Sequence, residues 1–256
     1  MLLLRRIFRI FSVPALVLFI SAFLVFLVGS NVRIAFGNST LYELGFSRHD
    51  VSQTTGLSTN QLSYAGQEIR DYFNSADEYL EVSFTVSGAN FNLFDQREII
   101  HMKDVKELLN TVSQVQEGSF LFLFIFVTMG LFIDGTEFAN SLRRLIIRAS
   151  LFSVALITLL GIVAAIAFGP LFTLFHELSF SNDFWILNPE TSYLVRMFPQ
   201  AFWLEGTLLI GALTIAEALG IIALLALTRW WNHRQELISR RKEPQFTVTV
   251  GDILQE

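Results

Sequence analysis

The chain has 256 residues, of which 52% are hydrophobic and only 16% are charged, and its mean hydropathy is +0.51. This composition excludes an ordinary soluble domain, in which charged residues are more frequent and apolar residues are less clustered. The net charge of −5 argues against nucleic acid as a partner. Because the chain contains no cysteine, disulfide bonds cannot hold any part of it together.

Four apolar runs are candidates for crossing a membrane. Ile10–Val32 and Ala149–Phe175 contain no charged residue, and Gly206–Thr228 contains one, Glu217. Ser119–Ile133 is shorter, about 22 Å as a helix against a hydrocarbon core of about 30 Å, so it needs flanking residues to span. We therefore expect a mainly α membrane protein with four transmembrane helices.

Basic residues are distributed unevenly around these runs. Residues 31–118 carry twelve acidic and six basic side chains, whereas the short flanks at the N-terminus, between the second and third runs, and after the fourth run are rich in arginine. Because basic loops stay in the cytoplasm, both termini are expected there, with the acidic segment outside. The predicted segments are a cytoplasmic N-terminus with the first transmembrane helix (1–32), an extracytoplasmic domain (33–116), the second helix (117–135), a cytoplasmic loop (136–148), the third helix (149–171), an extracytoplasmic loop (172–202), the fourth helix (203–229) and a cytoplasmic tail (230–256).

The extracytoplasmic domain combines helix and strand signals. Ser58 and Gln61 have the spacing of a capping box and predict the start of a helix. Glu81–Ser87 alternates apolar and polar residues as a strand does, and Phe91–Phe94 would be the return strand. Asn31–Thr59 is polar and is predicted to be irregular. The result is a small α+β domain that is marginal alone and leans on the membrane helices or a partner.

A helix beginning at Asp95 joins this domain to the second transmembrane helix. Asp95 and Glu98 have the spacing of a D-x-x-E variant of the capping box. At about 100° per residue, His101 lies in the apolar stripe of this helix, with Glu98 and Asp104 one turn to either side. An inward-facing histidine flanked by two carboxylates is the constellation in this sequence best suited to chemistry.

Two sequence blocks resemble a known bacterial family. They are REIIHMKDVK (Arg97–Lys106) and FHELSFSNDFWILNP (Phe175–Pro189), the second followed by FPQAFW (Phe198–Trp203). In this order and spacing they are similar to a family of four-helix integral membrane proteins known only as a domain of unknown function. The resemblance covers the chain except its C-terminal tail. It implies a bacterial cytoplasmic membrane protein with one helix, a long outer domain and three more helices, and it implies no activity.

His101 and His176 are both predicted on the outer side near the membrane surface, and acidic residues accompany them. Glu98 and Asp104 flank the first histidine, and Asp183 follows the second. Imidazole and carboxylate ligands suit zinc or another divalent transition metal, so these five residues are candidate metal ligands. The same residues could instead form a structural network of hydrogen bonds and ion pairs, or a proton-active or ligand-binding site.

Glu217 lies in the middle of the fourth apolar run, where an ionised carboxylate is costly unless it is paired or protonated. The structural explanation is a protonated side chain bonded to Ser153 or Thr158 on the third helix. The functional explanation is a proton or ion relay, or a polar contact to a cofactor or lipid. A transporter is disfavoured, because the sequence has neither an inverted repeat nor a pair of broken helices.

Two functions from different classes are consistent with these features. The preferred one is a non-catalytic accessory or scaffold subunit, whose helices contact the lipid bilayer and whose outer domain docks other membrane protein subunits. The alternative is a metal-dependent membrane enzyme with its site at the junction of the outer domain and the membrane. The two differ in whether the purified protein holds stoichiometric metal.

Overall fold

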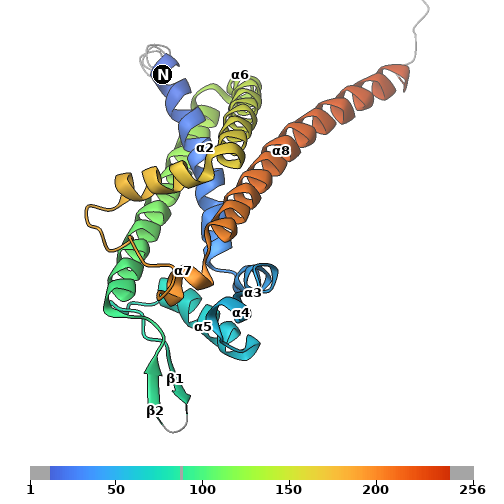
Figure 1. The fold of residues 1–256 in the computed structure, drawn as a ribbon. Helices are drawn as coiled ribbons and strands as arrows, with labels where there is room; N and C mark the ends of the chain where they lie inside the picture. Colours follow the sequence, from blue (N-terminus) through green and yellow to red (C-terminus); the bar gives the residue numbers. More distant parts are fainter. Residues whose placement is uncertain (1–11, 87–88, 243–256) are drawn as a thin grey trace, which may run out of the picture.

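The computed structural model describes residues 12–86 and 89–242, so residues 1–11 of the predicted N-terminal segment and residues 243–256 of the predicted tail lie outside the described part. Three described helices are long and apolar enough to cross a membrane. In Figure 1, α2 runs beside the first part of α6, and α8 leaves the pair at an oblique angle. The expectation of a mainly helical membrane protein is confirmed. The three helices are α2 (Ser12–Phe36), α6 (Gln96–Ser179) and α8 (Gln200–Lys242).

The backbone of α6 leaves helical geometry at two points. At Gly135 the dihedral angles are φ 51° and ψ −121°, in the positive-φ region that glycine adopts at low cost, and the chain turns back there (Figure 1). At Ala167 they are φ −136° and ψ 41°. Pro170 accounts for this second break, because proline lacks an N–H and its ring clashes with the carbonyl four residues earlier. Beyond Ala167, residues 168–179 form a short crosswise segment, which we call the interfacial segment (Figure 1).

An apolar cluster joins the three long helices. Phe19, Phe23 and Leu27 of α2 pack with Ala149 of α6 and Ala218 of α8. Both alanines are fully buried. Lipid tails are as apolar as these side chains, so helices in a membrane associate through close packing, which small residues allow. The cluster therefore fixes the frame on which the outer part of the molecule is built.

The region predicted to be irregular is largely helical. Asn38 caps the first of its helices, since its side chain accepts a hydrogen bond from the backbone N–H of Thr40 at 3.0 Å. The predicted capping box of Ser58 and Gln61 is present in full and opens the third helix. These helices are α3 (Ser39–Arg48), α4 (Val51–Thr55) and α5 (Thr59–Asn74).

A two-stranded antiparallel hairpin follows, made of β1 (Ser83–Val86) and β2 (Ala89–Asn92). Phe84 pairs with Phe91, and Ser83 pairs with Asn92. The return strand therefore begins two residues earlier than Phe91–Phe94, where the sequence placed it. The part of the predicted turn at Gly88 lies outside the described residues.

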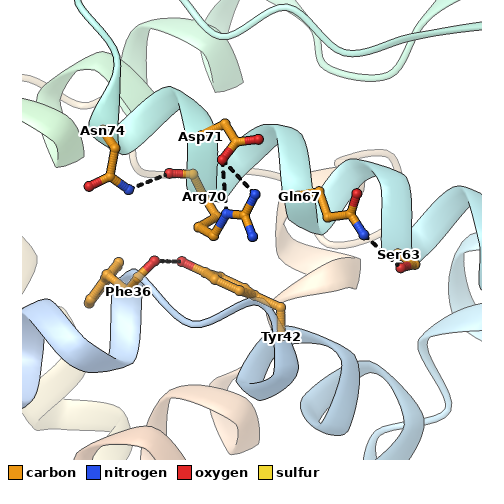
Figure 2. A network of polar contacts seen from close by, with 7 residues as sticks. All are labelled: Phe36, Tyr42, Ser63, Gln67, Arg70, Asp71 and Asn74. Atoms are coloured by element: carbon orange, nitrogen blue, oxygen red, sulfur yellow. Dashed lines mark hydrogen bonds and ion pairs between the residues drawn. The ribbon is translucent and has the colours of Figure 1, made fainter.

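One hydrophobic core contains residues from α3 and α5 and from the chain between α6 and α8. Tyr42, Leu62 and Ile69 of α3 and α5 share this core with Leu194 of α7 (Tyr193–Met197) and with Phe198. The Tyr42 hydroxyl donates to the Phe36 carbonyl at 3.0 Å, which satisfies an otherwise unpaired carbonyl at the end of α2 (Figure 2). This bond attaches α3 directly to the end of α2. Burial of the Tyr42 side chain also raises the pKa of its hydroxyl group.

We expect Gly45→Ala to lower the thermal unfolding midpoint of the purified protein, because a Cβ atom there would overlap the Phe202 ring of α8. Overpacking of this kind costs about 1–3 kcal/mol. The matched control is Gly118→Ala in α6, where a Cβ atom meets nothing within 4 Å. That change should be neutral or stabilising by up to about 1 kcal/mol through helix propensity. Equal midpoints for the two variants would contradict the packing of α3 against α8.

Candidate functional site

The structure brings the two predicted histidines together. His101 lies in the second turn of α6 and His176 lies in the interfacial segment, and each is 7% exposed. Their ring centroids are 5.9 Å apart, with 34° between the ring planes. The capping box of Asp95 and Glu98 is present and fixes the start of the helix that carries His101. Because the chain of α6 changes direction at Gly135 and at Ala167, its last part lies beside its first part, and His176 faces His101.

Aromatic side chains enclose this pair. The Phe172 ring lies 4.3 Å from that of His176, and the Trp185 ring lies 5.0 Å from it. Phe180 contacts both histidines, with centroid distances of 5.2 Å to His101 and 5.6 Å to His176. We call these five residues the histidine site. It is a pair of imidazoles largely removed from water.

This burial keeps both imidazoles neutral. Desolvation lowers the pKa of His101 from 6.5 to about 4, helped by the neighbouring His176 and opposed by Asp104. Desolvation also lowers the pKa of His176, against a raising effect from its hydrogen bond to the Phe172 carbonyl. Near pH 7 both rings therefore carry a lone pair that can accept a proton.

The hydrogen bonds define which nitrogen of His176 is protonated. Its Nδ1 lies 2.6 Å from the Phe172 carbonyl oxygen. A carbonyl can only accept, so Nδ1 carries the hydrogen and the lone pair of the neutral ring is on Nε2. His101 differs, because its buried Nδ1 has no hydrogen-bond partner among the described residues. A buried nitrogen is seldom left unpaired, so this atom is open to a hydrogen bond from water, a ligand or a substrate.

Glu98 does not face the histidines. Its carboxylate is buried, 1% exposed, and accepts hydrogen bonds from the Ser192 hydroxyl at 2.5 Å and the Leu194 N–H at 2.8 Å. It also accepts from the backbone N–H of Asp95 at 2.7 Å, as the second half of the capping box. Glu98 therefore attaches the chain before α7 to the start of α6.

The Asp104 carboxylate and the Arg97 guanidinium hold the loop that carries the aromatic residues. Asp104 accepts a hydrogen bond from the Asn182 side chain at 2.9 Å. Arg97 donates to the backbone carbonyl of Asp183, and its guanidinium lies 5.5 Å from the centre of the Phe184 ring. These contacts position the loop from Phe180 to Trp185 over His176.

The expected convergence of five metal ligands is not found. Within residues 12–86 and 89–242, no three His, Cys, Asp or Glu side chains are grouped so that they could hold one metal ion. His101 and His176 come together, whereas Glu98, Asp104 and Asp183 are used or placed elsewhere. The donor geometry therefore gives no support to a zinc site at these residues.

Glu217 has a partner that differs from the predicted ones. Asn31 of α2 donates to its Oε2 at 2.9 Å and also contacts the Thr214 hydroxyl at 3.2 Å. Ser153, a predicted partner, instead donates to the Ala149 carbonyl of its own helix. Asn31 lies in the last two turns of α2, so its partner Glu217 lies near the C-terminal end of that helix. Arg33, two residues after Asn31, forms an ion pair with Glu117.

Several residues of this region carry no strong signal in the sequence. Asn182, the partner of Asp104, and the aromatic residues Phe180 and Trp185 lie within the block Phe175–Pro189, which indicated the family but not the role of these residues. Their spacing around His176 could have been used, because a histidine within a short aromatic block is easily buried. Asn31, at the edge of an apolar run, gave no indication of a partner on the fourth helix.

Comparison with known proteins places the chain among enzymes. The family model described as "Lipoprotein intramolecular transacylase Lit" matches residues 16–203. The solved structure of membrane integral lipoprotein intramolecular transacylase Lit from Bacillus cereus is similar with a TM-score of 0.70 at 16% identity, covering 88% of this chain and 97% of that chain. A variant of that protein, with one histidine replaced by alanine, gives 0.66 at 15% identity, covering 88% and 94%.

A curated relative, an "Uncharacterized protein" of Aquifex aeolicus (strain VF5), is 31% identical over 121 residues, or 47% of this chain. The matched part spans about half, 51%, of that relative's length.

These matches correct two expectations from the sequence. The resemblance to a membrane family is confirmed, but the family is not one of unknown function. A non-catalytic accessory or scaffold subunit is wrong, because the family is one of transacylases; the sequence blocks indicated membership without indicating the activity. Because the family model covers most of the chain, this protein belongs to the lipoprotein intramolecular transacylase Lit family.

Proposed function

We propose that this protein moves an acyl group from one position to another within a lipoprotein, and that His101 and His176 transfer the protons. The observation that carries the proposal is the pair of neutral imidazoles, 5.9 Å apart, inside an aromatic enclosure. The family name supplies the reaction class, and the geometry supplies the groups that the reaction needs.

The chemistry requires one proton acceptor and one proton donor. In an acyl shift, a nucleophilic heteroatom of the substrate bonds to the acyl carbon, and the bond from that carbon to its original heteroatom breaks. The nucleophile loses a proton and the leaving atom gains one, so no proton is consumed overall. His176 accepts the first proton at Nε2, and the imidazolium that forms is stabilised by the Phe172 carbonyl. His101, on the other side of the pair, passes a proton to the leaving atom, either directly or by relaying the proton taken up by His176.

The interfacial segment explains how a lipid-bearing substrate reaches this pair. Leu174, Phe175 and Leu178 are large apolar side chains on it that are 48%, 50% and 79% exposed. A short helix with such a face lies in the boundary between head groups and acyl chains. His176 lies on the same segment and is buried toward α6. The histidine site is thereby held at the depth in the membrane where the acyl chain of a lipoprotein joins the polar group to which it is bonded.

The topology belongs to the same proposal. Because α6 turns back at Gly135, its first two parts cross the membrane separately and, with α2 and α8, give four crossings. The segment from 33 to 116 is an outer α+β domain of a protein in the bacterial cytoplasmic membrane. The distribution of arginine supports placing both termini in the cytoplasm.

A single cysteine tests this orientation, because the chain contains no other. Ser83 is exposed at the start of β1, so Ser83→Cys should react with a membrane-impermeant thiol reagent in intact cells or in spheroplasts. Ser141→Cys, which follows the Gly135 turn and is exposed, should react only after the membrane is opened. The reverse pattern would contradict the orientation.

The activity itself is tested with a purified, acylated lipoprotein and the purified protein in detergent or nanodiscs. An intramolecular shift leaves the total mass of the lipoprotein unchanged, so the position of the acyl group must be read from fragment ions in tandem mass spectrometry. We expect the same intact mass with a displaced acyl group. Transfer between molecules would change the intact mass, and unchanged fragments at high enzyme concentration would count against the proposal.

A further inference from the structure

The last part of α8 extends beyond the fourth apolar run as an unbroken helix to Lys242. Large apolar side chains are exposed on it: Trp230 by 55%, Trp231 by 56%, Leu237 by 50% and Ile238 by 41%. At about 100° per residue these four positions fall within about 120° of the helix circumference. We call them the surface stripe. Arg234 lies within the same arc, between Trp230 and Ile238, so this face combines apolar side chains with one arginine. Nothing in the described part of the chain covers it.

Positive charge accompanies this face. Residues 229–242 contain five arginine or lysine residues and one glutamate, a net charge of +4 with histidine neutral. The Arg234 guanidinium lies 5.3 Å from the centre of the Trp230 ring. Arg229 and Arg234 form no ion pair with any carboxylate of the described residues. The helix therefore presents apolar and cationic groups together.

This combination identifies the occupant. A helix surrounded by water would not expose two tryptophans beside leucine and isoleucine on one face. A second copy of the same helix would bring together two segments of net charge +4, which repel each other. An anionic bilayer surface satisfies both features, since tryptophan and arginine are favoured at the boundary and each cation there is attracted to acidic lipid.

We propose that residues 229–242 form an amphipathic anchor that binds the anionic head groups of phospholipid at the membrane surface where α8 emerges. Trp230, Trp231 and the two apolar residues that follow lie among the upper acyl chains. Arg229 and Arg234 reach the phosphate groups. This anchor is separate from the histidine site and does not depend on the proposed reaction.

The first test measures lipid selectivity of the full-length protein in proteoliposomes. Spin-labelled phosphatidylglycerol and phosphatidylcholine report their relative association with the protein by electron paramagnetic resonance. We expect a several-fold preference for phosphatidylglycerol that weakens with added salt. The preference should fall at least twofold in R229Q/R234Q, which lowers the net charge of residues 229–242 from +4 to +2. The matched control, R48Q/R70Q, removes the same charge from the outer domain and should retain it.

The second test locates the surface stripe directly. In W185F/W203F the remaining tryptophans are Trp230 and Trp231. Brominated phosphatidylglycerol should quench their fluorescence more than brominated phosphatidylcholine at equal content. Equal association of the two spin-labelled lipids with the wild-type protein would overturn the proposal. So would selectivity that is unchanged in R229Q/R234Q, or tryptophans quenched by aqueous iodide and not by brominated lipid, which would place water over the stripe.

Discussion

His176→Ala is expected to reduce the rate of acyl transfer by about 10²–10⁴-fold, the usual contribution of a positioned general base. The reason lies in the hydrogen bond of Nδ1 to the Phe172 carbonyl, which leaves Nε2 as the free acceptor of the ring. His176→Gln keeps a hydrogen-bonding side chain of similar reach but cannot exchange a proton near neutral pH, so it should be as inactive as the alanine variant. The fragment-ion assay with purified lipoprotein gives the rate.

The pH dependence gives an independent reading of the same groups. The pKa of His101 is lowered to about 4 and that of His176 is also lowered from 6.5, so the neutral forms persist at pH 7. Activity should be level near neutral pH and should decline on the acid side only below pH 6.5, as the imidazoles bind protons. The two apparent values belong to the coupled pair, so His101→Ala should change the acid limb as well as the rate.

The control for folding is His49→Ala, a histidine outside the histidine site whose ring lies 6.4 Å from the Phe202 ring. It should retain transfer. Each histidine variant should also keep a cooperative thermal transition, so that lost activity is not lost structure. A folded His176→Ala or His101→Ala variant with the wild-type rate would remove the proposed chemistry from this pair.

Glu98→Ala should destabilise the protein by about 3 kcal/mol. The carboxylate is fully buried and accepts from the Ser192 hydroxyl and from two backbone N–H groups, those of Leu194 and Asp95. Truncation leaves these donors buried without a partner, and charge-assisted hydrogen bonds of this kind are among the stronger ones. Chemical denaturation of the detergent-solubilised protein, followed by tryptophan fluorescence, measures the change in the free energy of unfolding.

The matched control is Glu107→Ala, about two and a half turns further along α6, where the side chain is exposed. Surface substitutions of this type stay within about 0.5 kcal/mol. If Glu98→Ala and Glu107→Ala had the same effect, Glu98 would not attach the chain before α7 to α6, and a direct role for Glu98 at the histidine site would have to be considered again.

Features determined within a few residues of sequence were predictable. The capping boxes of Ser58 with Gln61 and of Asp95 with Glu98 depend on a three-residue spacing, and both are present. The apolar runs also located the long helices, because a bilayer sets a minimum apolar length. Asn38 is also a local cap, but the polar stretch around it concealed a short helix whose stability comes from burial of Tyr42 and Phe46.

Contacts between distant segments were not predictable in the same way. The sequence placed His101 and His176 in one candidate site, but the geometry of their pairing requires the turn at Gly135 and the break at Ala167, and neither angle can be read from composition. The local sequence is equally consistent with a Glu98 side chain that contacts His101 and with one that contacts a distant segment of the chain. The choice depends on Ser192 and Leu194, which are far away in sequence. Asn31 and Glu217 meet for the same reason, through the oblique path of α8.

We expect the break at Ala167 to make the distance between the two imidazoles sensitive to the thickness of the lipid around the protein. In the proposed function, His176 lies on a segment at the boundary of the hydrocarbon, whereas His101 lies near the start of α6, beside the outer helices. A bilayer whose thickness does not match the apolar length of the helices would tilt one part relative to the other. The rate of the proposed acyl transfer should therefore pass through an optimum as the acyl chains of the host lipid are lengthened, and the activity would then depend on membrane composition.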